Sequence, residues 1–161
     1  MVFLTIYNIV MSKPRVRIYP VLKWVGGKRK IEDVILSAVE NINKPFTYYE
    51  PFFGGGAIFF SLYSKGFIKK AHLNDVVPQV VNFYNVISNE DGRNILKKEA
   101  KKIESKFNNL NTDIEKRKEQ YIKFRENFND GWECFVAEDK KTGPESKVKL
   151  AAQFLALNKL G

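Results

Sequence analysis

The hydrophobic pattern near the start of the chain predicts an extended segment followed by a helix. Pro14 and Pro20 disfavour a helix over 14–23, which we expect to be extended. From Lys28 to Ile42, apolar side chains recur every three or four residues, which predicts an amphipathic helix. Its buried face is predicted to comprise Ile31, Val34, Ile35, Ala38, Val39 and Ile42.

Strand-like and helical patterns then alternate along the chain. Aromatic and β-branched residues predict buried strands over 47–52 and 68–74. The apolar segment 57–64 predicts a helix that ends at Gly66, and Pro78 suits the first turn of the next helix. The inner face of that next helix is predicted to hold Val80, Val81, Tyr84 and Ile87. The alternation predicts an α/β fold with a parallel sheet and covering helices.

The chain becomes more charged in its second half. Two helices are predicted over 91–128, and Thr112 and Glu115 have the spacing of a capping box near the start of the second. Residues 129–143 are predicted to be a polar loop that contains Trp132. This region has no strand signal, so we interpret it as a helical insertion on the α/β core.

A final helix is predicted to begin at Pro144, with an inner face formed by Leu150, Phe154 and Leu157. The predicted organisation is a tail over 1–13, a cofactor-binding α/β core over 14–89 and a helical segment over 90–161. Only two core strands are recognisable, whereas an open α/β sheet normally has more. We therefore expect the chain to be the first part of something larger.

The charge balance favours a polyanionic partner. The 161 residues include 27 Lys and Arg against 18 Asp and Glu, a net charge of +9, and nucleic acid is the common partner of such a chain. From charge alone, a soluble basic protein is an equally good interpretation. The single cysteine, Cys134, suggests a reducing cytoplasm, and the single histidine, His72, excludes a multi-histidine metal site. We expect Cys134 to be buried and His72 to lie on a strand surface, with no membrane span.

The first candidate ligand-binding segment precedes the first predicted helix. Gly26 and Gly27 allow a tight turn, Lys28 adds a positive charge, and Trp24 offers a flat ring to a base or a sulfonium. The segment is not a Walker loop, because Arg29 follows the lysine and the required upstream glycine is missing. A structural turn with a basic helix cap is the alternative interpretation.

The second candidate segment joins a predicted strand to a predicted helix. Glu50 is followed by Pro51, two phenylalanines and three glycines, and consecutive glycines are entropically costly, which favours function over a simple turn. About twenty residues later, Asp75 follows a strand, at the rim where α/β proteins bind ligands. Its alternative role is to cap the next helix. Together these residues predict part of a site for an adenosine-bearing cofactor.

Four segments together carry a family resemblance. VLKWVGGKRK, YYEPFFGGGAIFF, LNDVVPQVVNFYNVI and AAQFLALNKLG resemble, in order and spacing, the Dam-like (D12 class) DNA adenine-N6 methyltransferases over about residues 20–161. The resemblance implies a partial Rossmann-like methyltransferase fold with a helical target-recognition insertion. It also implies S-adenosylmethionine as cofactor and, as substrate, an adenine flipped out of double-stranded DNA.

The resemblance also implies roles for individual residues. The implied cofactor-binding residues are Trp24, Gly26, Gly27, Lys28, Glu50, Phe52, Phe53, Gly54, Gly55, Gly56 and Asp75. The lysines implied to follow DNA phosphates are Lys97, Lys98, Lys101 and Lys102. For these lysines, a solvated helix face is the alternative interpretation.

The sequence departs from the family in one respect. The Asp-Pro-Pro-Tyr signature of the family engages the adenine amino group, but this sequence contains no Pro-Pro pair, so we assign no catalytic residue. We expect the chain alone to be inactive. It could be the product of a truncated gene, a deliberately shortened protein or one part of a split enzyme that a second chain completes. The alternatives are a non-enzymatic, basic DNA-binding or regulatory remnant and, less favoured, an NTP-binding protein. The sequence does not choose among restriction–modification, a phage enzyme and mismatch-repair marking as the biological setting.

Overall fold

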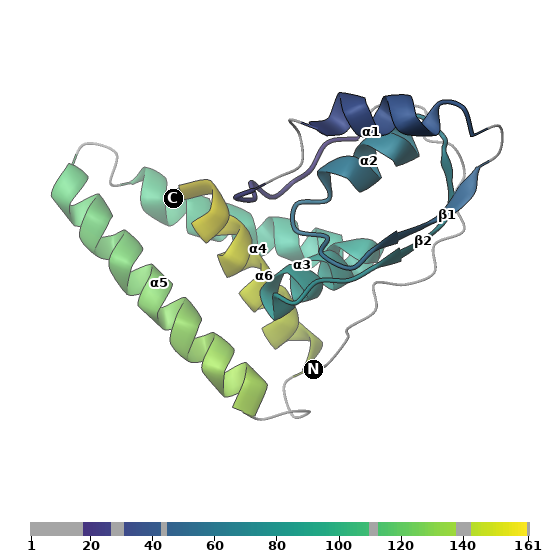
Figure 1. The fold of residues 1–161 in the computed structure, drawn as a ribbon. Coiled ribbons are helices and arrows are strands. Elements are labelled where there is room, and N and C mark those ends of the chain that lie inside the picture. The colour runs from purple at the N-terminus through teal and green to yellow at the C-terminus, as the bar shows by residue number, and fades with distance from the viewer. Residues whose placement is uncertain (1–17, 27–30, 43–44, 110–112, 138–142, 161) are drawn as a thin grey trace. The chain divides into compact units, whose positions relative to one another are not determined.

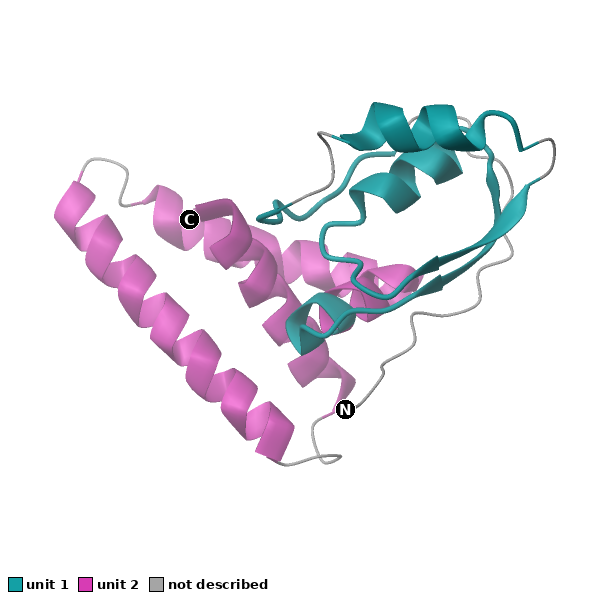
Figure 2. Ribbon diagram, in the orientation of Figure 1, with its two compact units in different colours: residues 1–81 teal, residues 82–161 magenta. Residues whose placement is uncertain are grey.

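The computed structural model describes residues 18–26, 31–42, 45–109, 113–137 and 143–160 (Figure 1). The chain divides into two compact units, residues 1–81 and 82–161 (Figure 2). The described part holds six helices and two strands: α1 (Glu32–Val39), β1 (Phe46–Glu50), α2 (Ala57–Ser64), β2 (Ile68–Leu73), α3 (Pro78–Ser88), α4 (Glu90–Asn108), α5 (Ile114–Ala137) and α6 (Pro144–Leu160). The domain bounds expected from the sequence stay a prediction.

The first unit is built on two parallel strands. β1 pairs with β2 in a register that sets Tyr49 opposite His72 and Glu50 opposite Leu73. The rings of Tyr49 and His72 stack with centroids 4.6 Å apart, so the histidine lies on the strand surface, as expected. The parallel pairing and the alternation of helices and strands are both confirmed.

Local signals correctly located α2. The helix spans the predicted residues, and Gly66 adopts a positive φ of 80° just after it. The Gly66 N–H donates to the Tyr63 carbonyl and the Phe67 N–H donates to the Leu62 carbonyl, which satisfies the last carbonyls of the helix. The chain therefore turns directly from α2 into β2.

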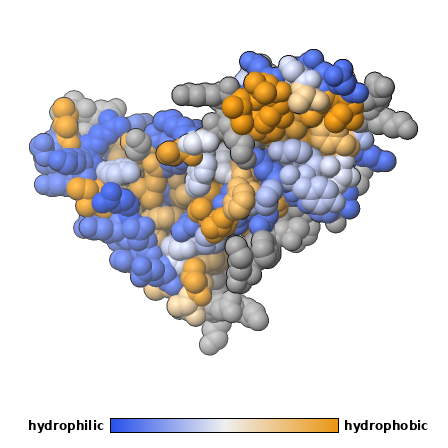
Figure 3. Space-filling model, viewed as in Figure 1, coloured by the Kyte–Doolittle hydropathy of each residue, from blue (hydrophilic) through white to orange (hydrophobic). Residues whose placement is uncertain are grey.

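The sequence misidentified the buried face of the first helix. α1 is shorter than predicted, Leu36 is its buried residue, and Val34 is 70% exposed although we expected it to be inside. The hydroxyl of Ser61 on α2 donates to Glu32 Oε1 over 2.7 Å, which turns the Glu32 side of α1 toward α2. Figure 3 shows the resulting hydrophobic area over α1 and α2. Residues 28–30 lie outside the described part of the chain, and residues 18–24 form no strand.

α3 begins at Pro78, as predicted, and continues across the boundary of the two units. Val80, Val81 and Tyr84 are buried, as expected, and the sequence missed Phe83 and Val86, which are buried too. In the second unit, α6 packs against α4 and α5, and Ala151 and Ala152 on it are fully buried. These small side chains allow neighbouring helices to approach closely.

The prediction of a polar loop around Trp132 is wrong. α5 continues to Ala137, and Trp132 is buried with Phe128 and Leu150 in a cluster against which Phe135, Phe154 and Leu157 also pack. Asn129, Asp130 and Gly131 resemble a loop, but burial of the flanking aromatic rings keeps them helical. Cys134, expected to be buried, is exposed. The inward positions predicted on α6 are confirmed.

The start of α5 is capped by a residue that the sequence analysis did not select. The Lys116 backbone N–H donates to Asp113 Oδ1 over 3.0 Å, and the Lys116 ammonium lies 3.0 Å from Asp113 Oδ2. Thr112, the predicted capping residue, lies outside the described part of the chain. No helix in the described residues is long and apolar enough to cross a membrane.

Replacing Gly92 should destabilise the second unit. Gly92 is buried in the first turn of α4, where its N–H donates to Asn89 Oδ1, and a Cβ there would overlap the Val86 carbonyl oxygen. We expect Gly92→Ala to lower the free energy of unfolding by about 1–3 kcal/mol, measured by urea denaturation. Gly131→Ala is the matched control: its Cβ would sit 3.6 Å from Leu150 Cδ2, so a helical alanine should be neutral or stabilise by up to about 1 kcal/mol. Equal effects would contradict this packing.

The cap of α5 should be visible in the titration of Asp113. The Lys116 backbone N–H, followed by the Lys116 side chain, lowers the pKa of this carboxyl. Because the folded-state pKa is depressed, the cap stabilises the helix above the ordinary Asp pKa of about 3.9 and is lost as pH falls through the lower folded value. In an NMR titration, Lys116→Gln should raise the Asp113 pKa without restoring the ordinary value, since the backbone donor remains. A return of the Asp113 pKa to its ordinary value in this variant would show that the Lys116 backbone N–H does not stabilise the carboxylate.

Candidate cofactor-binding site

The glycine loop leads from the end of β1 to the start of α2. Gly54 and Gly56 have positive φ values of 51° and 74°, which side-chain-bearing residues rarely adopt. The Gly56 N–H donates to the Phe53 carbonyl over 2.8 Å, and the Phe60 N–H donates to the Gly56 carbonyl over 2.9 Å. The loop therefore passes into the helix through a tight hydrogen-bonded turn that requires these glycines.

Asp75 holds the glycine loop from the end of the neighbouring strand. Its Oδ2 accepts the Gly54 N–H over 2.6 Å, and its Oδ1 accepts the Val77 N–H over 2.8 Å. Backbone bonds from the Phe53 N–H to the Asn74 carbonyl and from the Asn74 N–H to the Glu50 carbonyl, both 2.9 Å, continue the parallel pairing beyond the strands. The carboxyl ends of β1 and β2 are thus joined at the place where α/β folds bind ligands.

Two acidic residues are buried at this end of the sheet. In the described part of the chain, Glu50 and Asp75, 5% and 7% exposed, are the only buried carboxylates. Burial, followed by the charge of Glu50 and a hydrogen bond with it, raises the pKa of the Tyr48 phenol well above its ordinary value. Buried carboxylates are costly unless they are hydrogen-bonded or paired. Both of these carboxyl groups lie beside the glycine loop.

The indole of Trp24 packs on the glycine loop. A Cβ on Gly54 would lie 2.6 Å from Trp24 Cδ1, and a Cβ on Gly55 would lie 3.1 Å from the Leu22 carbonyl oxygen. Trp24, Gly54 and Asp75 therefore converge, as the sequence predicts. The loop backbone is covered on this side by the protein itself. Sequence analysis missed Leu22, for which the chain offers no signal apart from its closeness to Trp24.

The other predicted site residues have varied environments. Phe53 is buried, with its ring centroid 5.6 Å from that of Phe59, so its side chain belongs to the core. Phe52 is 65% exposed, and Gly26 is exposed with a positive φ of 75°. Gly27 and Lys28 lie outside the described part of the chain. Ligand-binding roles for all these residues stay predictions.

The four predicted DNA-binding lysines lie in the second unit. All are exposed on α4, on the side away from its buried Leu96 and Phe107. One of them, Lys102, forms an ion pair of 2.6 Å with Glu99. In the regions that the structure describes, no group of three or more His, Cys, Asp or Glu side chains is arranged to hold a metal ion. The DNA-binding role of the lysines stays a prediction.

The chain is similar to known DNA methyltransferases. It is 37% identical over 150 residues to Type II methyltransferase M.MjaIII of Methanocaldococcus jannaschii, covering 87% of this chain and 45% of that relative. DNA adenine methylase of Haemophilus influenzae is 37% identical over 81 residues, which are 50% of this chain and 26% of the relative. DNA adenine methylase of Vibrio cholerae is 32% identical over 109 residues, 67% of this chain and 33% of the relative.

The chain therefore spans less than half the length of each of these relatives. The comparisons do not support a separate second chain, and no solved structure matches. A family model described as D12 class N6 adenine-specific DNA methyltransferase matches residues 24–161, which include the glycine loop and Asp75. This chain belongs to the D12 class N6 adenine-specific DNA methyltransferase family.

Proposed function

We propose that this chain is the N-terminal, cofactor-binding part of an enzyme that methylates adenine N6 in double-stranded DNA. The observation that carries the proposal is the hydrogen bond between Asp75 and Gly54, which joins the ends of two parallel strands around a glycine loop. This arrangement is typical of nucleotide-binding α/β folds, and we infer a Rossmann-like sheet of which β1 and β2 are part. Family membership and the names of the relatives support the same reaction.

We propose S-adenosylmethionine as the cofactor, because its sulfonium and its ribose hydroxyls both suit the residues around the loop. The cofactor supplies an electrophilic methyl group on a sulfonium. Its positive charge would suit the carboxylates of Glu50 and Asp75 and the face of the Trp24 ring. Asp75 has two acceptor oxygens, each with more than one lone pair, so it retains capacity for the ribose hydroxyls while holding Gly54 and Val77.

The glycine loop would position the cofactor rather than react with it. Asp75 fixes Gly54, and Trp24 packs on Gly54 and Gly55, so the loop backbone is ordered before a ligand arrives. Pre-ordering reduces the entropy that binding must remove. A rigid loop would also hold the methyl group in line for transfer, which is the main contribution that positioning makes to such a reaction.

DNA would be held by the basic surface of the second unit. Lys97, Lys98, Lys101 and Lys102 are exposed on one side of α4, and the net charge of +9 favours a polyanion. The residues that would engage the adenine amino group are not among these 161, which contain no Pro-Pro pair. We therefore propose that this chain supplies the donor side of the reaction and that an Asp-Pro-Pro-Tyr segment supplies the acceptor side.

Cofactor binding should depend on the Asp75 carboxylate. In Asp75→Asn, the amide nitrogen cannot accept a backbone N–H, so one hydrogen bond of the anchor and the negative charge are lost. A hydrogen bond to a charged group contributes about 1.5–3 kcal/mol, so we expect S-adenosylhomocysteine affinity to fall roughly tenfold to a hundredfold in isothermal titration calorimetry. Asp91→Asn, an exposed change in α4, is the control and should leave affinity unchanged.

Circular dichroism should show that both variants remain folded. Unchanged affinity in folded Asp75→Asn would remove Asp75 from the site. Absence of any binding to the unmodified protein would favour the non-enzymatic DNA-binding remnant instead. Tighter binding of ATP than of S-adenosylhomocysteine would indicate a nucleotide-binding protein.

Methyl transfer should require the missing acceptor residues. We expect the purified 161-residue chain to transfer no tritiated methyl group from S-adenosylmethionine to DNA. A fusion that adds a segment bearing the family's Asp-Pro-Pro-Tyr signature should restore transfer, and the same fusion with the Asp of that signature changed to Ala should not. Methylation by the 161 residues alone would contradict the proposed division of roles.

A further inference from the structure

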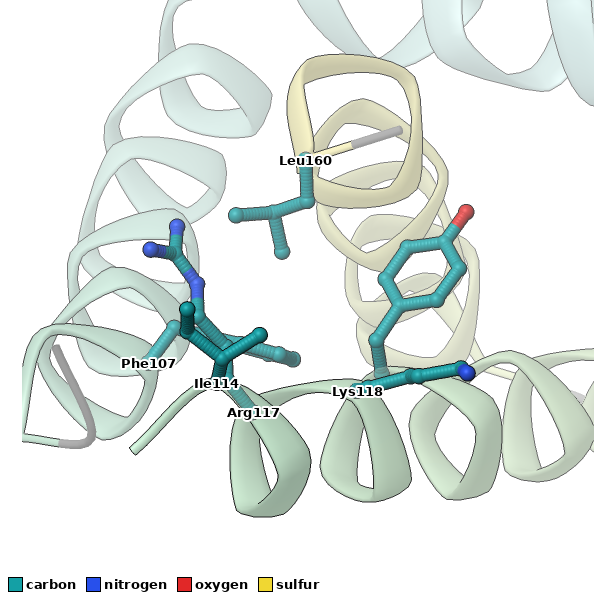
Figure 4. A pocket seen from close by; sticks show the side chains of 6 residues that line it. Phe107, Ile114, Arg117, Lys118 and Leu160 are labelled. Carbon is teal, nitrogen blue, oxygen red and sulfur yellow. The ribbon is translucent and has the colours of Figure 1, made fainter. Parts of the chain in front are cut away.

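The first turns of α5 line a pocket that no sequence motif indicates. Ile114, Arg117, Lys118 and Tyr121 recur at helical spacing along one face of α5. Together with Phe107 of α4 and Leu160 of α6, they enclose an open pocket of about 240 Å³ within the second unit. Figure 4 shows Leu160 at the end of α6, opposite the part of α5 that bears Ile114, Arg117 and Lys118.

The pocket combines an apolar floor with two cations. Phe107 is buried, whereas Ile114 is 80% exposed, so the pocket presents an isoleucine to solvent at its mouth. The side chains of Arg117 and Lys118 are exposed, and neither takes part in an ion pair among the described residues. No carboxylate is among the described residues that line the pocket. Two adjacent cations without a counter-charge are complementary to an anion.

The neighbouring lysines differ from this pair. Lys116 precedes it on α5 but is engaged by Asp113, and Lys102 on α4 is engaged by Glu99. Lys97, Lys98 and Lys101 are exposed on α4 and none of them lines the pocket. The α5 pair thus combines two cations that form no ion pair among the described residues with an apolar hollow. A hollow with two cations can hold an anion at one place, whereas exposed lysines alone attract a polyanion without a fixed position.

We propose that this pocket binds one sugar–phosphate unit of the DNA backbone. A guanidinium presents a planar fork to phosphate oxygens, the neighbouring ammonium adds a point charge, and the apolar wall suits the C–H face of a deoxyribose. Such a contact would fix the position of the duplex without reading its sequence. The inference rests on the proposed function, of which it specifies the DNA contact.

The salt dependence of DNA binding tests the two cations. For a short labelled duplex followed by fluorescence anisotropy, each lost phosphate contact reduces the slope of log affinity against log salt by about 0.9. Because the pocket is proposed to hold one phosphate, we expect Arg117→Gln/Lys118→Gln to reduce the slope by about 1 and to weaken binding equally for unrelated sequences. Lys123→Gln/Arg125→Gln removes one lysine and one arginine from the same helix, both exposed and outside the pocket, and should change the slope less.

A second variant tests the hollow itself. Ile114→Trp keeps every charge but fills the mouth of the pocket, so it should also weaken binding, while circular dichroism stays unchanged. Equal slopes in the two double variants, or no effect of Ile114→Trp, would overturn the pocket and leave only a general positive field. No DNA binding by the unmodified chain would overturn it together with the DNA-contacting part of the proposed function. Cofactor affinity is measured separately, so the cofactor site would still stand.

Discussion

The hydrogen bond from the Gly54 N–H to the Asp75 carboxylate is the interaction on which the candidate site depends. The bond is buried, with 2.6 Å between the Gly54 nitrogen and Asp75 Oδ2, and it joins residues 21 positions apart in sequence. A charged acceptor makes such a bond stronger than a neutral one, and burial makes its loss more costly. The other oxygen of Asp75 accepts the Val77 N–H at the approach to α3. One side chain therefore fixes the loop after β1 and the turn after β2 relative to each other.

The glycines of this loop have a reason that does not involve a ligand. A side chain on Gly54 would collide with the Trp24 indole, and one on Gly56 would overlap the Phe53 ring. The close packing of aromatic rings on the loop thus requires glycine, in addition to the positive φ values. A glycine-rich loop at the start of a helix is therefore evidence of an ordered, closely packed backbone before it is evidence of a bound ligand. The proposed use of the loop for a cofactor is supported by the buried acids beside it and by the family match.

Local signals made part of this fold predictable. Gly66 and Pro78 fixed a helix end and a helix start because their backbone preferences act without tertiary contacts. Trp132 was misassigned because its polar neighbours indicate a loop, and the packing that keeps them helical comes from α6, more than fifteen residues later. Leu36 was missed because the orientation of α1 is set by a hydrogen bond from Ser61. In the site, Trp24, Gly54 and Asp75 were predictable as a group, whereas the α5 pocket was not, since three helix ends form it.

The distribution of charge separates the two proposed ligands. The chain carries a net charge of +9, yet the only buried charged residues in its described part are the two acids beside the glycine loop. A sulfonium cofactor gains nothing from the overall positive charge, and the local acids are what would favour it. The lysines and arginines of α4 and α5 are exposed, where long-range attraction of a polyanion is effective and sensitive to salt. A cationic donor and an anionic acceptor would then be attracted by fields of opposite sign within one small chain. The overall excess of basic residues therefore bears on the proposed DNA contact, whereas the proposed cofactor site depends on individual side chains near the glycine loop.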